Sequence, residues 1–140
     1  MKQVHSQIEN GVMTITFDNP DTMNGLTWEG IEQLSDCYQL LLDDSSIKVV
    51  VFTGNDKYFY TGGRVDASIP GEQKKYADAI ARYDMLSAKV KTPKIAAVSG
   101  CCLKAGMGLL ASCDFAVARE GVEFGFPEVR MGGVPMMVMV

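Results

Sequence analysis

The stretch TPKIAAVSGCCLKAGMGLLASCDFAVA, residues 92–118, decides the fold class, because it places a short helical run between two apolar strand-like runs. Residues 94–100, KIAAVSG, are compact and apolar, which is typical of a buried strand. Residues 105–112 are then predicted to form a short helix and residues 114–118 a further strand. A strand, a helix and a strand in succession indicate parallel pairing within one sheet.

The rest of the chain continues this alternation. Residues 12–17 vary with period two and predict a strand, and residues 48–54 form a β-branched run that we expect to be buried on both faces of a parallel sheet. Helices are predicted after Thr27, a plausible cap, and over residues 72–89. Their apolar positions are Ile31, Leu34, Tyr38, Leu41 and Leu42 in the first and Tyr76, Ile80, Tyr83 and Leu86 in the second. The expected fold class is therefore α/β with a mostly parallel sheet, in a single domain over residues 1–140.

Composition and charge limit the possible partners. The chain has 140 residues, of which 47% are hydrophobic and 21% charged, as in a globular domain. Its net charge of −4 argues against nucleic acid or an anionic membrane as a partner. No apolar run reaches the roughly 18–20 residues that cross a bilayer, and the N-terminus lacks the apolar core of a signal peptide. We therefore expect a cytoplasmic protein that binds a small molecule.

The cysteines and the histidine argue against a metal site and against a catalytic triad. The four cysteines, Cys37, Cys101, Cys102 and Cys113, show no CxxC spacing and no paired histidines. We expect them to be small buried hydrophobes in a reducing compartment. The only histidine, His5, lies in a polar N-terminal segment and is expected at the surface. A Ser–His–Asp or Cys–His mechanism would depend on it.

Two glycine-rich loops could bring backbone N–H groups to one ligand. Gly62–Gly63 follows the aromatic run at residues 58–60, and either a tight turn or the close approach of a ligand explains the pair. Residues 99–108 lead into the short helix, whose first N–H groups have no intrahelical partner. One N–H from each loop could converge on a single oxygen as an oxyanion hole. The GxG at Gly106–Gly108 lacks the third glycine of a dinucleotide fingerprint, so we exclude that class.

A single carboxylate, Glu128, follows Pro127 among apolar neighbours in the segment 123–135. It could act as an acid/base beside the oxyanion hole, although a solvated side chain explains it equally well in isolation. The chain ends in an apolar run, Met136–Val140, whose surface needs burial. Either a partner covers this run or the chain is a fragment, and we favour the fragment.

Taken in order, four motifs resemble those of the crotonase, or enoyl-CoA hydratase/isomerase, superfamily. They are NPDTMNGLT at residues 19–27, YFYTGGRV at 58–65, the stretch at 92–118 and FGFPEVRMGGVP at 124–135. The resemblance covers essentially the whole chain, but only the N-terminal half of a usual family subunit, without the C-terminal helical region. It implies a spiral of ββα units, incomplete at the C-terminus, that binds an acyl-CoA thioester.

The resemblance also implies roles for individual residues. The oxyanion hole would be the N–H groups of Gly63 and Ala105, with Glu128 as the acid/base. The substrate and its CoA would be contacted by Met23, Asn24, Leu26, Tyr60, Gly62, Arg64, Val65, Lys104 and Phe126.

Four of these contact residues carry alternatives. Arg64 could select a polar or carboxylated acyl chain. Lys104 could be solvated, which we favour, or assist a CoA phosphate. Tyr60 and Phe126 could line the acyl pocket or belong to the core.

One departure from the family pattern bears on the reaction. Family hydratases use two glutamates, and the position of the first is Gly108 here. Isomerases that convert 3-enoyl-CoA to 2-enoyl-CoA can work with the equivalent of Glu128 alone, so isomerisation stands ahead of hydration. Candidates for a substitute acid are Glu120, Glu123 and Asp66.

The resemblance implies no metal and no cofactor beyond the CoA of the substrate, and a homotrimer or a pair of trimers. Decarboxylation and thioester hydrolysis remain possible within the fold. The alternative to an enzyme is a non-catalytic or truncated crotonase-fold subunit that acts only in assembly or CoA binding.

Overall fold

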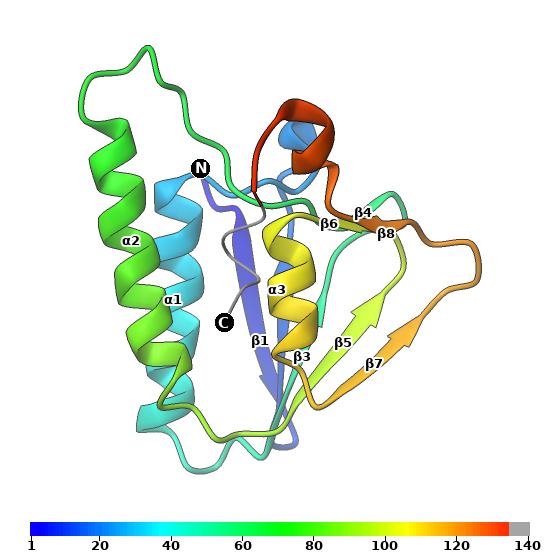
Figure 1. Ribbon diagram of the computed structural model, residues 1–140. Coiled ribbons are helices and arrows are strands. Elements are labelled where there is room, and N and C mark those ends of the chain that lie inside the picture. Colours follow the sequence, from blue (N-terminus) through cyan, green and yellow to red (C-terminus); the bar gives the residue numbers. More distant parts are fainter. Residues whose placement is uncertain (135–140) are drawn as a thin grey trace.

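The computed structural model describes residues 1–134, which form two β-sheets with helices on one side (Figure 1). The larger sheet has the strand order β1-β2-β3-β5-β7, in which only the β1–β2 pair is antiparallel. Its strands are β1 (Val4–Glu9), β2 (Val12–Phe17), β3 (Val49–Thr53), β5 (Lys94–Val98) and β7 (Phe115–Ala118). The smaller sheet is parallel and contains β4 (Tyr58–Tyr60), β6 (Cys101–Leu103) and β8 (Phe124–Gly125).

After the N-terminal hairpin of β1 and β2, each turn of the chain contributes one strand to each sheet and then a helix. Strands β3 and β4 precede α2 (Glu72–Ser87), strands β5 and β6 precede α3 (Ala105–Ala111), and strands β7 and β8 precede the short 3₁₀ helix η2 (Pro127–Met131). A further 3₁₀ turn, η1 (Pro20–Thr22), and α1 (Trp28–Asp43) follow the N-terminal hairpin. The predicted α/β class and spiral of ββα units are confirmed.

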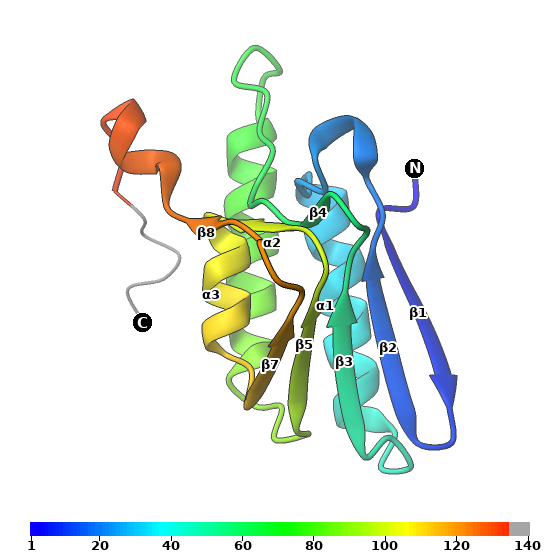
Figure 2. The ribbon, with the colours of Figure 1, turned by 90° about the vertical axis from the view of Figure 1, so that its right-hand side faces the viewer.

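The helices cover one face of the larger sheet and leave its other face open (Figure 2). Met13, Ile15 and Phe17 alternate along β2 toward the helices and are fully buried. On β3, Val50 and Phe52 point the same way, and Phe52 stacks between Phe17 and Tyr38 of α1, with ring centroids 6.4 and 6.0 Å away. This alternation follows from the period of two in a strand.

Two expectations about burial are wrong. The segment 48–54 was expected to be buried on both faces, but Val49 and Val51 are only half-buried because nothing covers their side of the sheet in the described chain. On β7 both Phe115 and Val117 are 69% exposed. Leu42, predicted on the apolar side of α1, is 38% exposed, because it lies beyond the stripe that faces the sheet.

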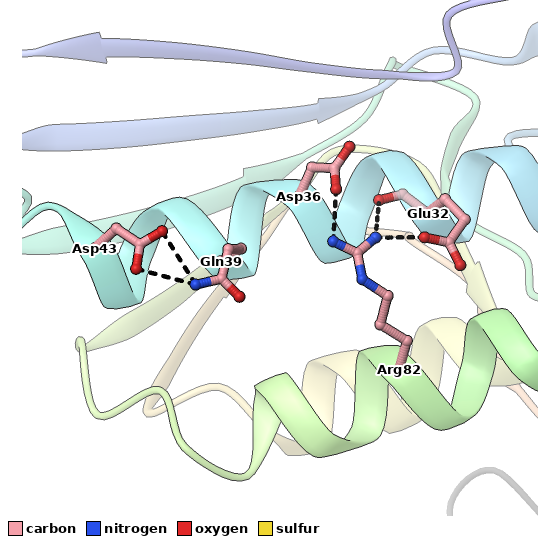
Figure 3. A network of polar contacts seen from close by, with 5 residues as sticks. All are labelled: Glu32, Asp36, Gln39, Asp43 and Arg82. Atoms are coloured by element: carbon pink, nitrogen blue, oxygen red, sulfur yellow. Dashed lines mark hydrogen bonds and ion pairs between the residues drawn. The ribbon is translucent and has the colours of Figure 1, made fainter.

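Helices α1 and α2 are joined by polar contacts across their outer sides (Figure 3). The guanidinium group of Arg82 on α2 donates to the carboxylates of Glu32 and Asp36 on α1, with 2.7 Å between Nη2 and Asp36 Oδ1. Gln39 and Asp43 form a second contact within α1, at 3.0 Å. Because these groups are partly exposed, each ion pair contributes at most about 1 kcal/mol to stability.

The ends of the elements also differ from expectation. Thr27 is the N-cap residue of α1 but its hydroxyl does not cap the helix, because it donates to the Glu29 carboxylate and accepts from Gln3 Nε2, at 2.6 and 2.8 Å. Helix α2 ends at Ser87 instead of residue 89. Strands β1, β4, β6 and β8 were not expected, because they are polar or very short.

The structure also shows the exposure of the histidine and of the four cysteines. His5 is exposed, as expected, and all four cysteines are free thiols, although Cys101 and Cys113 are only half-buried. Within residues 1–134, no helix is long and apolar enough to span a membrane. The expectation about Met136–Val140 lies outside the described residues.

Candidate active site

The two glycine-rich loops meet at one end of the spiral. Gly62 adopts a φ of +98°, a conformation that favours glycine. A Cβ on Gly62 would lie 2.8 Å from Lys104 Cβ and 3.3 Å from Ala105 N, so the loop after β4 is in contact with the start of α3. The structure thus brings together the two loops that were predicted to converge.

Each loop offers one N–H group that has no acceptor among residues 1–134. Leu26 N–H donates to Gly62 O and Arg64 N–H donates to Leu26 O, at 3.0 and 2.8 Å, which leaves the intervening N–H of Gly63 without a role in this ladder. Ala105 is the first residue of α3, so its N–H has no intrahelical partner. Both donors are therefore available to an oxygen atom of a ligand.

Lys104 holds the second loop in a strained backbone conformation. Its φ of 54° and ψ of −125° lie in a region that non-glycine residues rarely adopt. The strand-like bond from Lys104 N–H to Gly125 O, 3.1 Å, and the turn bond from Met107 N–H to Lys104 O, 2.9 Å, fix it there. Holding this backbone conformation at a residue with a Cβ costs conformational energy.

A basic cleft of about 180 Å³ opens beside the first donor. Its only charged lining side chains among the described residues are Arg64 and Lys104, so it suits an anionic ligand. The basic cleft is lined by Thr22, Met23, Gly25, Thr61, Gly63, Arg64, Leu103, Lys104 and Pro127.

A second, apolar cavity of about 100 Å³ lies between α1, α2 and α3, beside the second donor. It includes Gly108, which offers no side chain, and the one carboxylate among its lining residues is that of Asp84 on α2, whose pKa is raised by burial. The apolar cavity is lined by Ile31, Leu34, Tyr60, Ile80, Tyr83, Asp84, Ser87, Ala105, Gly108, Leu109 and Ser112. The Gly63 and Ala105 pair thus lies between a basic and an apolar space.

Glu128 occupies the first turn of η2, next to Pro127 of the basic cleft. One carboxylate oxygen, Oε2, is shielded from solvent and has no hydrogen-bond partner in the described part of the chain. The backbone is held by the bond from Gly133 N–H to Glu128 O, at 2.8 Å. A shielded carboxylate oxygen without a partner is costly, and such groups are often functional.

The side chains of Asn24 and Leu26 are fully buried, so only their backbone atoms are left to meet a ligand, and their contact with the substrate stays a prediction. The Asn24 amide donates to Phe17 O and Tyr58 O, at 3.0 and 2.8 Å, and accepts from Asn19 N–H. These residues shape the loop that carries Met23, which is 50% exposed at the cleft.

The other candidates divide between the two spaces and the surface. Tyr60 is both buried in the core and part of the apolar cavity, and burial raises its pKa well above the ordinary range. Arg64 lines the basic cleft and not the apolar cavity, and its selection of an acyl chain stays a prediction. Phe126 is 37% exposed, and Val65 39%, and among the described residues neither lines either space.

The candidate substitute acids lie apart from the two donors. Asp66, Glu120 and Glu123 are all exposed. The hydroxyl and N–H of Ser68 hydrogen-bond to Asp66 and lower the pKa of its carboxyl group. None of these side chains lines the basic cleft or the apolar cavity as described for residues 1–134.

Tyr76 is a residue of this region that the sequence assigned only to the apolar face of a helix. A Cβ on Gly63 would lie 1.9 Å from its hydroxyl oxygen, so any other residue at position 63 would displace this phenol. This contact adds an explanation for Gly63 to the tight turn and the approach of a ligand. The sequence carries no signal for this contact, because the two residues belong to different elements.

Comparison with known proteins first defines the class of fold. A crystal structure of an enoyl-CoA hydratase from Bacillus anthracis superposes with a TM-score of 0.84 over 97% of this chain and 55% of that chain, at 22% identity, which shows a common fold. An enoyl-CoA hydratase subunit from Geobacillus kaustophilus, 31% identical, superposes with a TM-score of 0.80 over 96% of this chain and 53% of that chain.

Sequence comparison then places the chain in its family. Residues 7–140 match the family model described as enoyl-CoA hydratase/isomerase, and the chain belongs to this family. A 2,3-dehydroadipyl-CoA hydratase from Escherichia coli is 34% identical over 89% of this chain and 49% of its own length. A probable enoyl-CoA hydratase from Mycobacterium tuberculosis is 33% identical over 88% and 48%. The chain thus spans about half the length of the curated relatives it matches.

Proposed function

We propose that the protein is an acyl-CoA enzyme of the enoyl-CoA hydratase/isomerase type that stabilises a thioester enolate. The observation that carries this proposal is the pair of N–H groups, from Gly63 and Ala105, that have no acceptor among the described residues and lie on loops in contact. The thioester oxygen would accept from both as it gains negative charge. A preorganised donor of this kind lowers the activation barrier by roughly 3–4 kcal/mol in other enzymes.

The two spaces on either side of the donors fit the two arms of an acyl-CoA. Arg64 and Lys104 would attract the phosphates of CoA into the basic cleft, so we now favour a phosphate contact over a solvated Lys104. The apolar cavity would receive the acyl chain, and its small volume suits a short one. No cofactor beyond the CoA of the substrate is needed, because the chemistry consists of proton transfers.

Glu128 would transfer the proton. For a 3-enoyl-CoA, its carboxylate removes a proton from the α carbon, and the electron pair moves onto the thioester oxygen to form the dienolate. The carboxylic acid then returns the proton to the γ carbon, which leaves a 2-enoyl-CoA and the ionised glutamate. The unpartnered Oε2 supports this role, because no group among the described residues competes with the substrate proton for that oxygen.

Two observations favour different reactions at this site. Gly108 supplies no second carboxylate to the apolar cavity, which favours isomerisation by one glutamate. The names of the relatives favour hydration, in which a water molecule adds to a 2-enoyl-CoA. We place isomerisation first, because addition of water without a second acid is harder.

Deuterium exchange followed by NMR tests the proposal. The protein is incubated in heavy water with a short 3-enoyl-CoA or a 2-enoyl-CoA, beside Glu128→Gln and the control Glu9→Gln, whose carboxylate is exposed on β1. We expect deuterium at the α or γ carbon with the wild type and with Glu9→Gln, but not with Glu128→Gln. The product distinguishes isomerisation from hydration. Absence of exchange by a folded wild-type sample would exclude the catalytic role of this chain.

The second candidate is a non-catalytic crotonase-fold subunit that acts in assembly or CoA binding. Gly108 favours it, because the site lacks a group that two-glutamate hydratases need. The enzyme proposal predicts a homotrimer or hexamer, and the second candidate predicts a monomer or an aggregate when the chain is alone. Light scattering after size-exclusion chromatography separates the two.

A further inference from the structure

The phenol of Tyr76 lies directly against the backbone of Gly63. The position of a Cβ on Gly63 would be 1.9 Å from Tyr76 Oη and 2.5 Å from Tyr76 Cζ. These distances place the hydroxyl in van der Waals contact with Gly63 Cα. Tyr76 thus projects from the second turn of α2 to Gly63, which lines the basic cleft.

The Tyr76 hydroxyl has no hydrogen-bond partner among residues 1–134. By contrast, the hydroxyl of Tyr83, two helical turns further along α2, donates to Tyr38 Oη at 3.3 Å. Burial raises the pKa of Tyr76 to about 12, so the hydroxyl keeps its proton throughout the physiological range. A protonated hydroxyl in partly desolvated surroundings is a donor that lacks an acceptor.

We propose that the Tyr76 hydroxyl is a third hydrogen-bond donor to the thioester oxygen held by the N–H groups of Gly63 and Ala105. This inference rests on the proposed function. Three donors from three elements, the β4 loop, α3 and α2, then surround one oxygen. The donor strengthens as the oxygen gains charge, so Tyr76 stabilises the enolate more than the bound thioester. In this role Tyr76 is a catalytic residue, because it touches the reacting group.

The infrared absorption of a bound thioester reports the donors at its oxygen. The probe is crotonyl-CoA labelled with ¹³C at the carbonyl, bound to the wild type, to Tyr76→Phe and to Tyr38→Phe. Tyr38 is the matched control, because it is another buried tyrosine whose hydroxyl contacts Tyr83 and not Gly63. We expect the carbonyl band to lie below its frequency in water in the wild type and in Tyr38→Phe, and to rise in Tyr76→Phe.

Kinetics provide a second measurement. Tyr76→Phe should lower the maximal rate of deuterium exchange by roughly a hundredfold, the usual effect of losing one oxyanion donor, while KM changes by less than about threefold. A residue that only packs against Gly63 would change neither the carbonyl frequency nor the rate in this pattern. Incorporation of 3-fluorotyrosine at position 76 keeps the side-chain shape and makes the phenol a stronger donor. It should lower the carbonyl frequency further, so this protein still tests the inference if Tyr76→Phe folds poorly.

The outcomes separate this inference from the proposed function. A low carbonyl frequency that is identical in the wild type, Tyr76→Phe and the fluorotyrosine protein overturns the role of Tyr76 and leaves the oxyanion hole intact. A carbonyl frequency equal to that in water for the wild type overturns both. An equal rise in Tyr38→Phe and Tyr76→Phe would assign the effect to packing and overturn the third donor.

Discussion

The two sheets of the molecule pack against their surroundings in different ways. In the larger sheet, side chains fill the space beneath α1, as where Phe52 stacks between Phe17 and Tyr38. Around the smaller sheet, backbone meets backbone. A Cβ at Gly54, Gly100 or Gly106 would lie 2.3, 2.2 or 2.0 Å from main-chain atoms of residues 57–60. Both donors of the candidate site follow strands of the smaller sheet, so the site lies where the chain has no room for side chains.

This difference shows how one small domain can combine a stable core with rigidly placed backbone donors. Side-chain packing tolerates adjustment, because rotamers can shift to refill a space. Backbone contacts cannot adjust in this way, so contacts between main-chain atoms fix the positions of the loops at Gly62 and Lys104. Preorganised N–H donors need that rigidity, because their effect depends on keeping their geometry as charge develops.

The largest expected effect comes from removing a side chain of the larger sheet. Phe52→Ala deletes a fully buried ring, and we expect the free energy of unfolding to fall by about 4 kcal/mol, from lost burial and an unfilled cavity. Urea denaturation measures it. Phe115→Ala is the matched control, because this ring is 69% exposed on the open face of the same sheet, and it should cost less than about 0.5 kcal/mol. Equal losses would mean that the open face is covered in solution.

The next effect comes from adding one carbon to the backbone contacts. In Gly100→Ala the new Cβ would lie 2.2 Å from Tyr58 N and 2.3 Å from Lys57 C, so β4 and β6 must move apart. We expect a loss of about 3 kcal/mol in the free energy of unfolding. The control Gly125→Ala, also in the smaller sheet, has its closest contact at 3.9 Å, from Leu103 Cδ2. A small effect at Gly100 would refute the idea that backbone contact positions this sheet.

The same difference explains what could be predicted from the sequence. Periodicity predicted β2, β3, α1 and α2, because side-chain burial repeats every two residues in a strand and every 3.6 in a helix. It could not predict β4, β6 or β8, since strands of two or three residues have no measurable period. The contact of Tyr76 with Gly63 and the burial of Asn24 depend on elements far apart in the sequence, and single-sequence patterns do not contain them. The candidate donors and Glu128 came from motif order, and their roles stay predictions.

Lys104 offers a smaller effect of the opposite sign. Lys104→Gly should raise the free energy of unfolding by about 1 kcal/mol, because relief of backbone strain exceeds the added entropy of the unfolded chain. Lys104→Ala is the control, because it removes the charge but keeps the Cβ, so it should give no gain. Urea denaturation at equal ionic strength compares the two. A gain in both variants would assign the effect to charge, and a gain in neither would mean that position 104 is not strained.

The smallest expected effect is a pH dependence from the buried thiol of Cys102, on β6 beneath the site. Burial raises its pKa from about 9.0 to about 12, so between these values the unfolded chain loses a proton that the folded chain keeps. The folded state binds more protons in this window, and the contribution of this thiol to stability therefore falls as pH rises, by roughly 0.8 kcal/mol between pH 7.5 and 9.5. The thiol of Cys113, whose pKa burial raises to about 11, adds a fall of the same sign. Urea denaturation with a reductant should show a fall in Cys102→Ala that is smaller than that of the wild type by about this amount, whatever that variant costs at pH 7.5. Parallel slopes would mean that the thiol is hydrated, and that the backbone contacts around the smaller sheet do not exclude water.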